Sequence, residues 1–143
     1  MTKALAVDPG ELRIGIAISD ETGTLARPLT ILKHTSRVED AINIAKLAQE
    51  HGTQTVVVGV ALNSDGEAGP KARSAMRLME AIRSVFSGVV VPWDESHSSR
   101  KAAEIRITAG VKRKKRADPI DDLAAAVILQ EYLDAQMTNR EKL

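Results

Sequence analysis

The 143-residue chain contains no cysteine, which excludes disulfide bonds, zinc–thiolate sites, iron–sulfur clusters and cysteine nucleophiles. Any metal ion must therefore be held by oxygen or histidine ligands. The chain also lacks an apolar run of the roughly 20 residues that cross a bilayer, and the apolar stretch at its start is too short for a secretory signal. We therefore expect a cytoplasmic protein with no membrane partner.

Aromatic residues are also scarce, since the chain has only Phe86, Trp93 and Tyr132. This scarcity argues against a platform that stacks single-stranded bases between aromatic rings. If the protein binds nucleic acid, the backbone of a duplex or a branched junction is the better target.

The length and the 43% hydrophobic residues suit one globular domain with a buried core. We expect a single domain over residues 1–143, with a flexible C-terminal tail from about residue 137. The net charge of +1 conceals a basic segment that contributes +5, which leaves −4 for the rest of the chain. This basic segment consists of Lys112, Arg113, Lys114, Lys115 and Arg116. It suggests a local site for an anion.

The first 32 residues predict three strands. Residues 3–7 are apolar, residues 8–10 form an Asp-Pro-Gly turn cluster, and isoleucine alternates with small residues over 14–18, which together predict a β-hairpin. Residues 24–32 predict a third strand, and Pro28 places it at a sheet edge or a bulge.

A helix and a buried strand follow. Ser36 and Glu39 have the spacing of a capping box, and an apolar stripe continues the helix until Gly52. The stripe consists of Val38, Ala41, Ile42, Ala45 and Ala48. Residues 55–60 are almost continuously apolar, as in a buried parallel strand, and a parallel strand after a helix implies a crossover.

The second half of the chain continues this alternation. We expect an amphipathic helix over 70–86, a buried strand over 89–91 and a helix over 98–108. A final helix is predicted to start with Asp118 as N-cap and Pro119 in the first turn, and to run through Tyr132. The pattern predicts an α/β fold with five strands.

Carboxylates occur at three positions where such a fold gathers ligands. Asp8 follows the first strand, Asp94 and Glu95 follow the last strand, and Asp121 and Asp122 lie in the first turn of the last helix. Each has an ordinary alternative: a turn cap, solvated loop charge, or a helix-dipole preference of about 0.3–1 kcal/mol. Open α/β sheets bind ligands at the carboxyl ends of their strands. The placement of these carboxylates together therefore favours a ligand site more strongly than any one of them alone.

Converging carboxylates repel one another, and hard divalent cations between them relieve the repulsion. This is the composition of a two-metal phosphodiester site, in which water is the nucleophile and no catalytic triad is needed. His97 is a further candidate for a base or a ligand, with a solvent-facing histidine as the alternative.

Basic residues near these carboxylates are candidates for phosphate contacts. The basic segment precedes Asp121, so it would draw a phosphate backbone towards the ions, although a solvated loop is the common fate of such a run. Arg13, Lys71 and Arg73 would widen this surface. The loop over 63–69 offers backbone amides to a phosphate, with weak specificity.

These residues together resemble the RuvX/YqgF family, described as Holliday junction resolvases and as nucleases that process the 5′ end of pre-16S ribosomal RNA. The resemblance covers nearly the whole chain. It is carried by Ala6-Val7-Asp8-Pro9-Gly10, Arg13-Ile14-Gly15-Ile16-Ala17, the loop from Gly59 to Gly69, Asp94-Glu95, Ile120-Asp121-Asp122-Leu123-Ala124-Ala125 and Ile128-Leu129-Gln130-Glu131-Tyr132-Leu133.

The resemblance implies a ribonuclease H-like fold with a central mixed five-stranded sheet flanked by helices, and a divalent-metal-dependent nuclease that uses Mg²⁺ or Mn²⁺. Asp8, Glu95 and Asp121 match the family's catalytic acidic positions, with Asp94 as a further metal ligand. Asp122 falls at a variable position. The implied partner is pre-rRNA or branched DNA, bound by a monomer or a homodimer.

The chain departs from the family after Glu95, because the family's usual Arg-Leu-Thr-Thr is replaced by Ser96-His97-Ser98-Ser99. The missing arginine weakens the match at this motif, and we hypothesise that His97 partly replaces its charge.

Two other functions compete with the nuclease. One is a catalytically silent nucleic-acid-binding ribosome-assembly factor, against which uncompensated carboxylates at a phosphate site argue. The other is a phosphotransferase of the sugar-kinase and actin type, whose first hairpin also has an Asp-x-Gly turn. Those enzymes need two such domains, and this chain has room for one.

Overall fold

The computed structural model describes residues 3–62, 66–95 and 123–141. In chain order, the elements are β1 (Ala4–Asp8), β2 (Arg13–Ser19), β3 (Ala26–Lys33), α1 (Arg37–Glu50), β4 (Thr55–Val60), α2 (Pro70–Val85), β5 (Val89–Asp94) and α4 (Leu123–Glu141). The five strands form one mixed sheet in the order β3-β2-β1-β4-β5. β1, β2 and β3 pair antiparallel, whereas β4 and β5 run parallel to β1. The predicted five-stranded α/β architecture is therefore confirmed.

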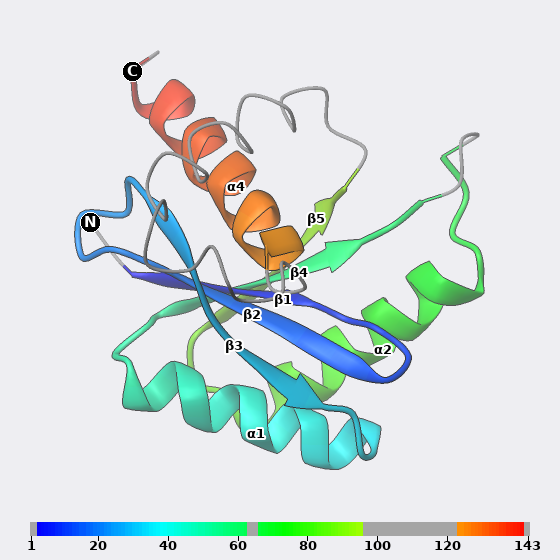
Figure 1. The fold of residues 1–143 in the computed structure, drawn as a ribbon. Helices are drawn as coiled ribbons and strands as arrows, with labels where there is room; N and C mark the ends of the chain where they lie inside the picture. The colour runs from blue at the N-terminus through cyan, green and yellow to red at the C-terminus, as the bar shows by residue number, and fades with distance from the viewer. Residues whose placement is uncertain (1–2, 63–65, 96–122, 142–143) are drawn as a thin grey trace.

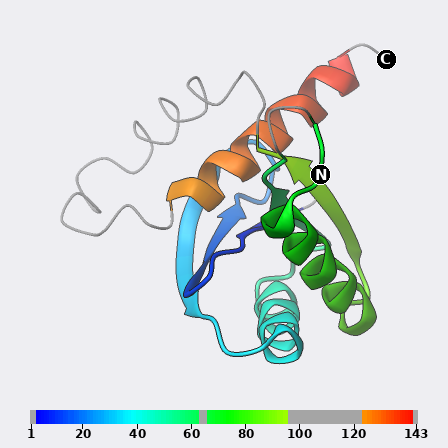
Figure 2. The same cartoon turned by 90° about the vertical axis from the view of Figure 1, so that its right-hand side faces the viewer.

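Helices cover both faces of the sheet, as Figures 1 and 2 show: α1 and α2 lie on one face and α4 crosses the other. Strand alternation sends side chains to two separate cores. In β1, Leu5 and Val7 join the core under α1 and α2, whereas Ala4 and Ala6 join the core under α4. Small residues on the α4 side let this helix pack closely on the sheet.

Pro28 has the position that the sequence predicts. β3 is an edge strand, and the β2–β3 register shifts between Ile16 and Ala17, so that Ile16 pairs with Thr30 and Ala17 with Pro28. A bulge and an edge tolerate the missing proline amide hydrogen. The predicted start of α1 is also confirmed, because the Ser36 hydroxyl accepts a hydrogen bond from the Glu39 amide at 3.1 Å.

The apolar stripe predicted for α1 is partly wrong. Ala41, Ala45 and Ala48 are buried as predicted, whereas Val38 and Ile42 are exposed and Ile44 completes the buried face. Positions 41, 44, 45 and 48 share one face at helical spacing, whereas Ile42 lies a 100° step away from Ala41. This face packs on the sheet and α2.

Two predicted element ends are also corrected. β5 continues to Asp94 rather than stopping at residue 91, and it is an edge strand with an exposed Val89 rather than a buried one. α4 continues past Tyr132 to Glu141, so residues 137–141 are helical. The predicted helix over 98–108 and the Asp118 cap lie outside the described residues. No helix in the described part of the chain is long and apolar enough to cross a membrane.

Candidate active site at the carboxyl edge of the sheet

Three parallel strands end at the same edge of the sheet. Val7 of β1 pairs with Val58 of β4, and Val60 of β4 pairs with Asp94 of β5. Asp8 therefore ends β1 next to the end of β4, and Glu95 follows directly after β5. A backbone hydrogen bond from the Glu95 amide to the Val60 carbonyl, 3.1 Å long, carries the pairing one residue beyond the strand.

Gly59 makes room for a carboxylate on the α4 side of this edge. A Cβ atom built on Gly59 would lie 3.3 Å from Glu95 Oε2 and 2.5 Å from the Cδ1 atom of Ile128 in α4. The Glu95 carboxylate thus occupies space over β4 that any other residue at position 59 would contest. A glycine in a run of valines is the sequence signal for such a close approach, and sequence reasoning assigned it no role.

Strand alternation separates the two adjacent acids of the Asp94-Glu95 pair. Val91 and Trp93 belong to the core under α4, whereas Val90, which has the same parity as Asp94, belongs to the core under α1 and α2. Asp8 shares its side with Ala4 and Ala6, which is also the α4 side. Alternation and the Gly59 contact therefore group Glu95, rather than Asp94, with Asp8.

The acidic side chains at this edge are half-buried, and each takes part in polar interactions. They are Asp8, Asp94 and Glu95. Among the residues that the structure describes, no three histidine or acidic side chains form a metal-binding group. The third predicted acid, Asp121, lies outside the described residues, as do Asp122 and His97. The first described residue of α4 is Leu123, which packs in the same core as Trp93.

Contacts between α4 and β5 support the Glu95 position. The rings of Trp93 and Tyr132 meet edge to face, with centroids 5.7 Å apart and an interplanar angle of 88°. The Trp93 indole donates a 3.4 Å hydrogen bond to Glu131 Oε1, a buried carboxylate of α4. Burial raises the pKa of the Tyr132 phenol, so this side chain stays neutral. These contacts hold the end of β5 against α4.

The predicted phosphate contacts are only partly described. Arg13 begins β2 with an exposed side chain, and Lys71 and Arg73 lie in the first turn of α2. The Arg73 guanidinium donates a 2.8 Å hydrogen bond to the Ala68 carbonyl, so part of its donor capacity holds the loop before α2. The basic segment over 112–116 lies outside the described residues.

Comparison with known proteins identifies the relatives of this chain. A family model described as "RuvX: Holliday junction resolvase" matches residues 2–135. A protein of Geobacillus kaustophilus named "Putative pre-16S rRNA nuclease" is 41% identical over 136 residues, which cover 94% of this chain and 99% of that protein. A protein of the same name from Thermoanaerobacter pseudethanolicus is 37% identical over 135 residues, covering 94% and 97%.

Solved structures with the same fold include Thermus thermophilus RuvC in complex with a Holliday junction substrate. The TM-score is 0.65 at 16% identity, and the match covers 96% of each chain. The fowlpox virus Holliday junction resolvase matches with a TM-score of 0.56 at 16% identity, over 94% of this chain and 99% of that one. At such identities the likeness shows the fold, which confirms the ribonuclease H-like prediction. From the family match and the identities to its relatives, we conclude that the chain belongs to the RuvX family.

Proposed function

We propose that this protein is a divalent-metal-dependent nuclease that hydrolyses phosphodiester bonds in structured nucleic acid. The observation that carries the proposal is the grouping of Asp8 and Glu95 on one side of the sheet, at the carboxyl ends of β1 and β5, the two parallel strands that flank β4. Family membership supports the same reaction, since its members are named as nucleases and resolvases.

The donor set fits hard divalent cations. Carboxylate oxygens are the ligands that Mg²⁺ and Mn²⁺ prefer, and the space above Gly59 admits the Glu95 carboxylate where a side chain would fill it. In this proposal Asp8, Glu95 and Asp121 hold the ions, with Asp94 as a further ligand. The bound ions would lower the pKa of an attacking water and stabilise the leaving oxygen.

The residues of the chain hold the ions and orient the substrate. Pairing with β4 restricts the backbone at the end of β1 and at Glu95, which limits where the Asp8 and Glu95 carboxylates can lie. The basic segment and Arg13, Lys71 and Arg73 attract and orient the phosphate backbone. In the reaction, a water oxygen bonds to phosphorus and gives up a proton, the bond from phosphorus to the leaving sugar oxygen breaks, and that oxygen takes up a proton.

The substrate proposal follows the names of the relatives. The curated relatives point to the pre-16S rRNA 5′ end, and the family model points to the Holliday junction. We test both substrates with the same enzyme preparation, comparing a labelled pre-rRNA fragment with a labelled four-way DNA junction in Mg²⁺, in Mn²⁺ and in chelator.

The decisive variant is Asp8→Asn, with Glu50→Gln at the exposed end of α1 as a matched control. We expect Asp8→Asn to lower the cleavage rate by more than about 100-fold. Losing a residue that only hydrogen-bonds a metal ligand costs up to about 100-fold, so a larger loss indicates a direct ligand. The control should cleave like the wild type. Binding without cleavage in every metal would instead favour the catalytically silent assembly factor.

A further inference from the structure

A groove lies beside the turn between β1 and β2, on the sheet face that α1 and α2 cover. Pro9 and Gly10 of the turn form one wall, His34 and Arg37 form another, and Ser74 of α2 closes it. Its volume is about 220 Å³. A wider cavity shares the turn, His34 and Ser74, and extends to Lys71 and Glu11. None of these groove residues belongs to the acidic edge on the α4 side.

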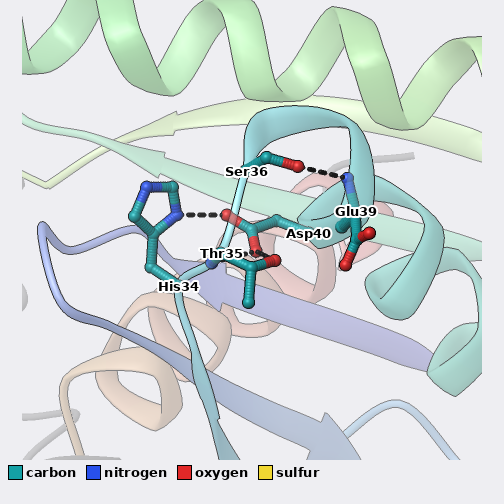
Figure 3. A network of polar contacts seen from close by, with 5 residues as sticks. All are labelled: His34, Thr35, Ser36, Glu39 and Asp40. Carbon is teal, nitrogen blue, oxygen red and sulfur yellow. Dashed lines mark hydrogen bonds and ion pairs between the residues drawn. The ribbon is translucent and has the colours of Figure 1, made fainter.

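His34 is held in this groove by a buried acid, as Figure 3 shows. The Asp40 side chain is only 3% exposed, and its Oδ2 atom contacts the Nδ1 atom of His34. Its Oδ1 atom accepts hydrogen bonds from the Thr35 amide at 3.1 Å and the Thr35 hydroxyl at 3.3 Å. These donors fix the carboxylate, and the carboxylate fixes the imidazole.

The pairing leaves the other ring nitrogen of His34 available to a ligand. The contact with the Asp40 carboxylate engages Nδ1, so Nε2 is the ring nitrogen that does not face Asp40. In Figure 3 this nitrogen points away from Asp40. The His34 side chain is 41% exposed, so a ligand in the groove can reach it.

The charges around the groove suit an anion. Arg37 and Lys71 are cationic, and neither forms an ion pair with any residue that the structure describes. The acids are Glu11 on the turn and Asp40, which is buried behind His34 and Thr35. Because the Asp40 carboxylate is buried and already bonded to Thr35 and His34, Glu11 is the exposed acid that faces the two cations. The hydroxyls of the groove serines add neutral donors.

We propose that this groove and the wider cavity beside it, lined by His34, Arg37 and Lys71, bind the phosphate backbone of nucleic acid away from the scissile bond. The polymeric ligand rests on the proposed nuclease function. Pro9 and Gly10 directly follow Asp8, so a backbone held against them passes next to the candidate catalytic edge. A guanidinium and an ammonium each bind phosphate oxygens through charge-assisted hydrogen bonds.

Binding of a labelled pre-rRNA fragment and a labelled DNA junction by the full chain tests the groove, measured by fluorescence anisotropy in chelator. Arg37→Ala and Lys71→Ala should each weaken binding about 3- to 10-fold and make the salt dependence shallower by about 0.7–0.9 per lost contact. Lys46→Ala, an exposed cation on α1, is the matched control and should change neither quantity. Equal melting temperatures exclude a folding defect.

His34→Gln tests the imidazole separately. The variant lacks the imidazole ring, so it should bind both nucleic acids more weakly than the wild type at constant pH. The matched control is His51→Gln at the other end of α1, which should bind like the wild type. Wild-type affinity in His34→Gln would show that His34 only fastens the loop before α1.

Three results would overturn the groove assignment. The first is that both cation variants keep the affinity and salt dependence of the wild type. The second is that the wild type does not bind either nucleic acid. The third is that a nucleoside monophosphate displaces the labelled nucleic acid as strongly as an unlabelled strand does. The last result would assign the groove to a free nucleotide. Cleavage separates the two proposals, since a wild type that binds through the groove without cutting refutes only the nuclease.

Discussion

Gly59 matters because it has no side chain. It stands in a strand of valines, between the sheet below and Ile128 and Glu95 above. A Cβ atom at position 59 would lie 2.5 Å from Ile128 Cδ1, far below van der Waals contact, and 3.3 Å from Glu95 Oε2, which is a tight contact. The missing side chain thus serves the packing of α4 and the position of the Glu95 carboxylate together.

Gly59→Ala should therefore lower both stability and cleavage. Overpacking against Ile128 should cost about 1–3 kcal/mol in the free energy of unfolding, measured by urea denaturation. Displacement of Glu95 should lower the cleavage rate at saturating metal.

A double variant separates the two effects. Ile128→Val removes the Cδ1 atom, so adding it to Gly59→Ala should restore part of the lost stability, with Ile128→Val alone as reference. Cleavage should remain low in the double variant. Recovery of full cleavage would show that Gly59 acts only through packing.

At the scale of the elements, the turn between β2 and β3 is organised by one carboxylate. Asp20 accepts hydrogen bonds from the amides of Thr24 at 2.8 Å and Leu25 at 3.2 Å, and from the Thr22 hydroxyl at 2.8 Å. Slight burial raises its pKa, but the bonds from Thr24, Leu25 and Thr22 outweigh that effect and lower the pKa overall.

This lowered pKa predicts an acid-sensitive contribution to stability. A carboxyl group whose pKa is lower in the folded state stabilises the fold above its unfolded pKa of about 3.9, and the contribution disappears as pH falls through the folded value. Asp20→Asn should therefore be less stable than the wild type at neutral pH, and the gap should close in acid. Thermal unfolding across pH measures this gap, and a constant gap would contradict the assignment.

The buried side-chain amide of Gln130 links α4 to the start of β3. Gln130 Oε1 accepts a hydrogen bond from the Ala26 amide at 2.9 Å, and its Nε2 atom donates to the Thr24 carbonyl at 2.9 Å. These bonds join residues more than 100 positions apart and place α4 across the antiparallel half of the sheet.

Gln130→Leu should destabilise the protein by about 1–3 kcal/mol, because a backbone donor and acceptor lose their partner inside the structure. Gln49→Leu, on the exposed face of α1, is the matched control and should stay within about 0.5 kcal/mol of the wild type. The urea midpoints of both variants measure the difference. Equal midpoints would mean that Gln130 contributes nothing beyond its packing.

At the scale of the whole molecule, the sheet separates two kinds of site. The acidic pair of Asp8 and Glu95 lies on the α4 side, and the groove around His34 lies on the α1 and α2 side. The β1–β2 turn joins them, since it follows Asp8 and forms one groove wall. Nucleic acid that contacts both sites would cross this turn.

The basic segment over 112–116 should add to such binding through its charge. Replacing its five basic residues with glutamine should weaken binding and make the salt dependence shallower, by about 0.9 per lost phosphate contact on duplex DNA. Titrations of a labelled junction at several salt concentrations measure the change. An unchanged salt dependence would identify the segment as a solvated loop.

Local patterns predicted most of the elements. Alternating isoleucines indicated β2, the Ser36 cap indicated the start of α1, and Pro28 indicated a sheet edge or a bulge, because each depends on neighbours within a few residues. The acidic candidates also followed from strand ends in the sequence. The end of α4 was wrong because no local stop signal marks it, and the exposed Val38 shows that apolar spacing alone does not determine which residues a helix buries.

Only the tertiary structure decided which of these residues meet. It grouped Glu95 with Asp8 and set Asp94 apart, because strand alternation acts on a register that pairing with β4 defines. It placed Ile128 and Glu95 in the space that a side chain at position 59 would need, and it brought His34 into contact with Asp40 beside the β1–β2 turn. The sequence by itself determined the family, the order of the elements and the acidic positions. Contacts between residues far apart in the chain determined the sides of the sheet on which they act.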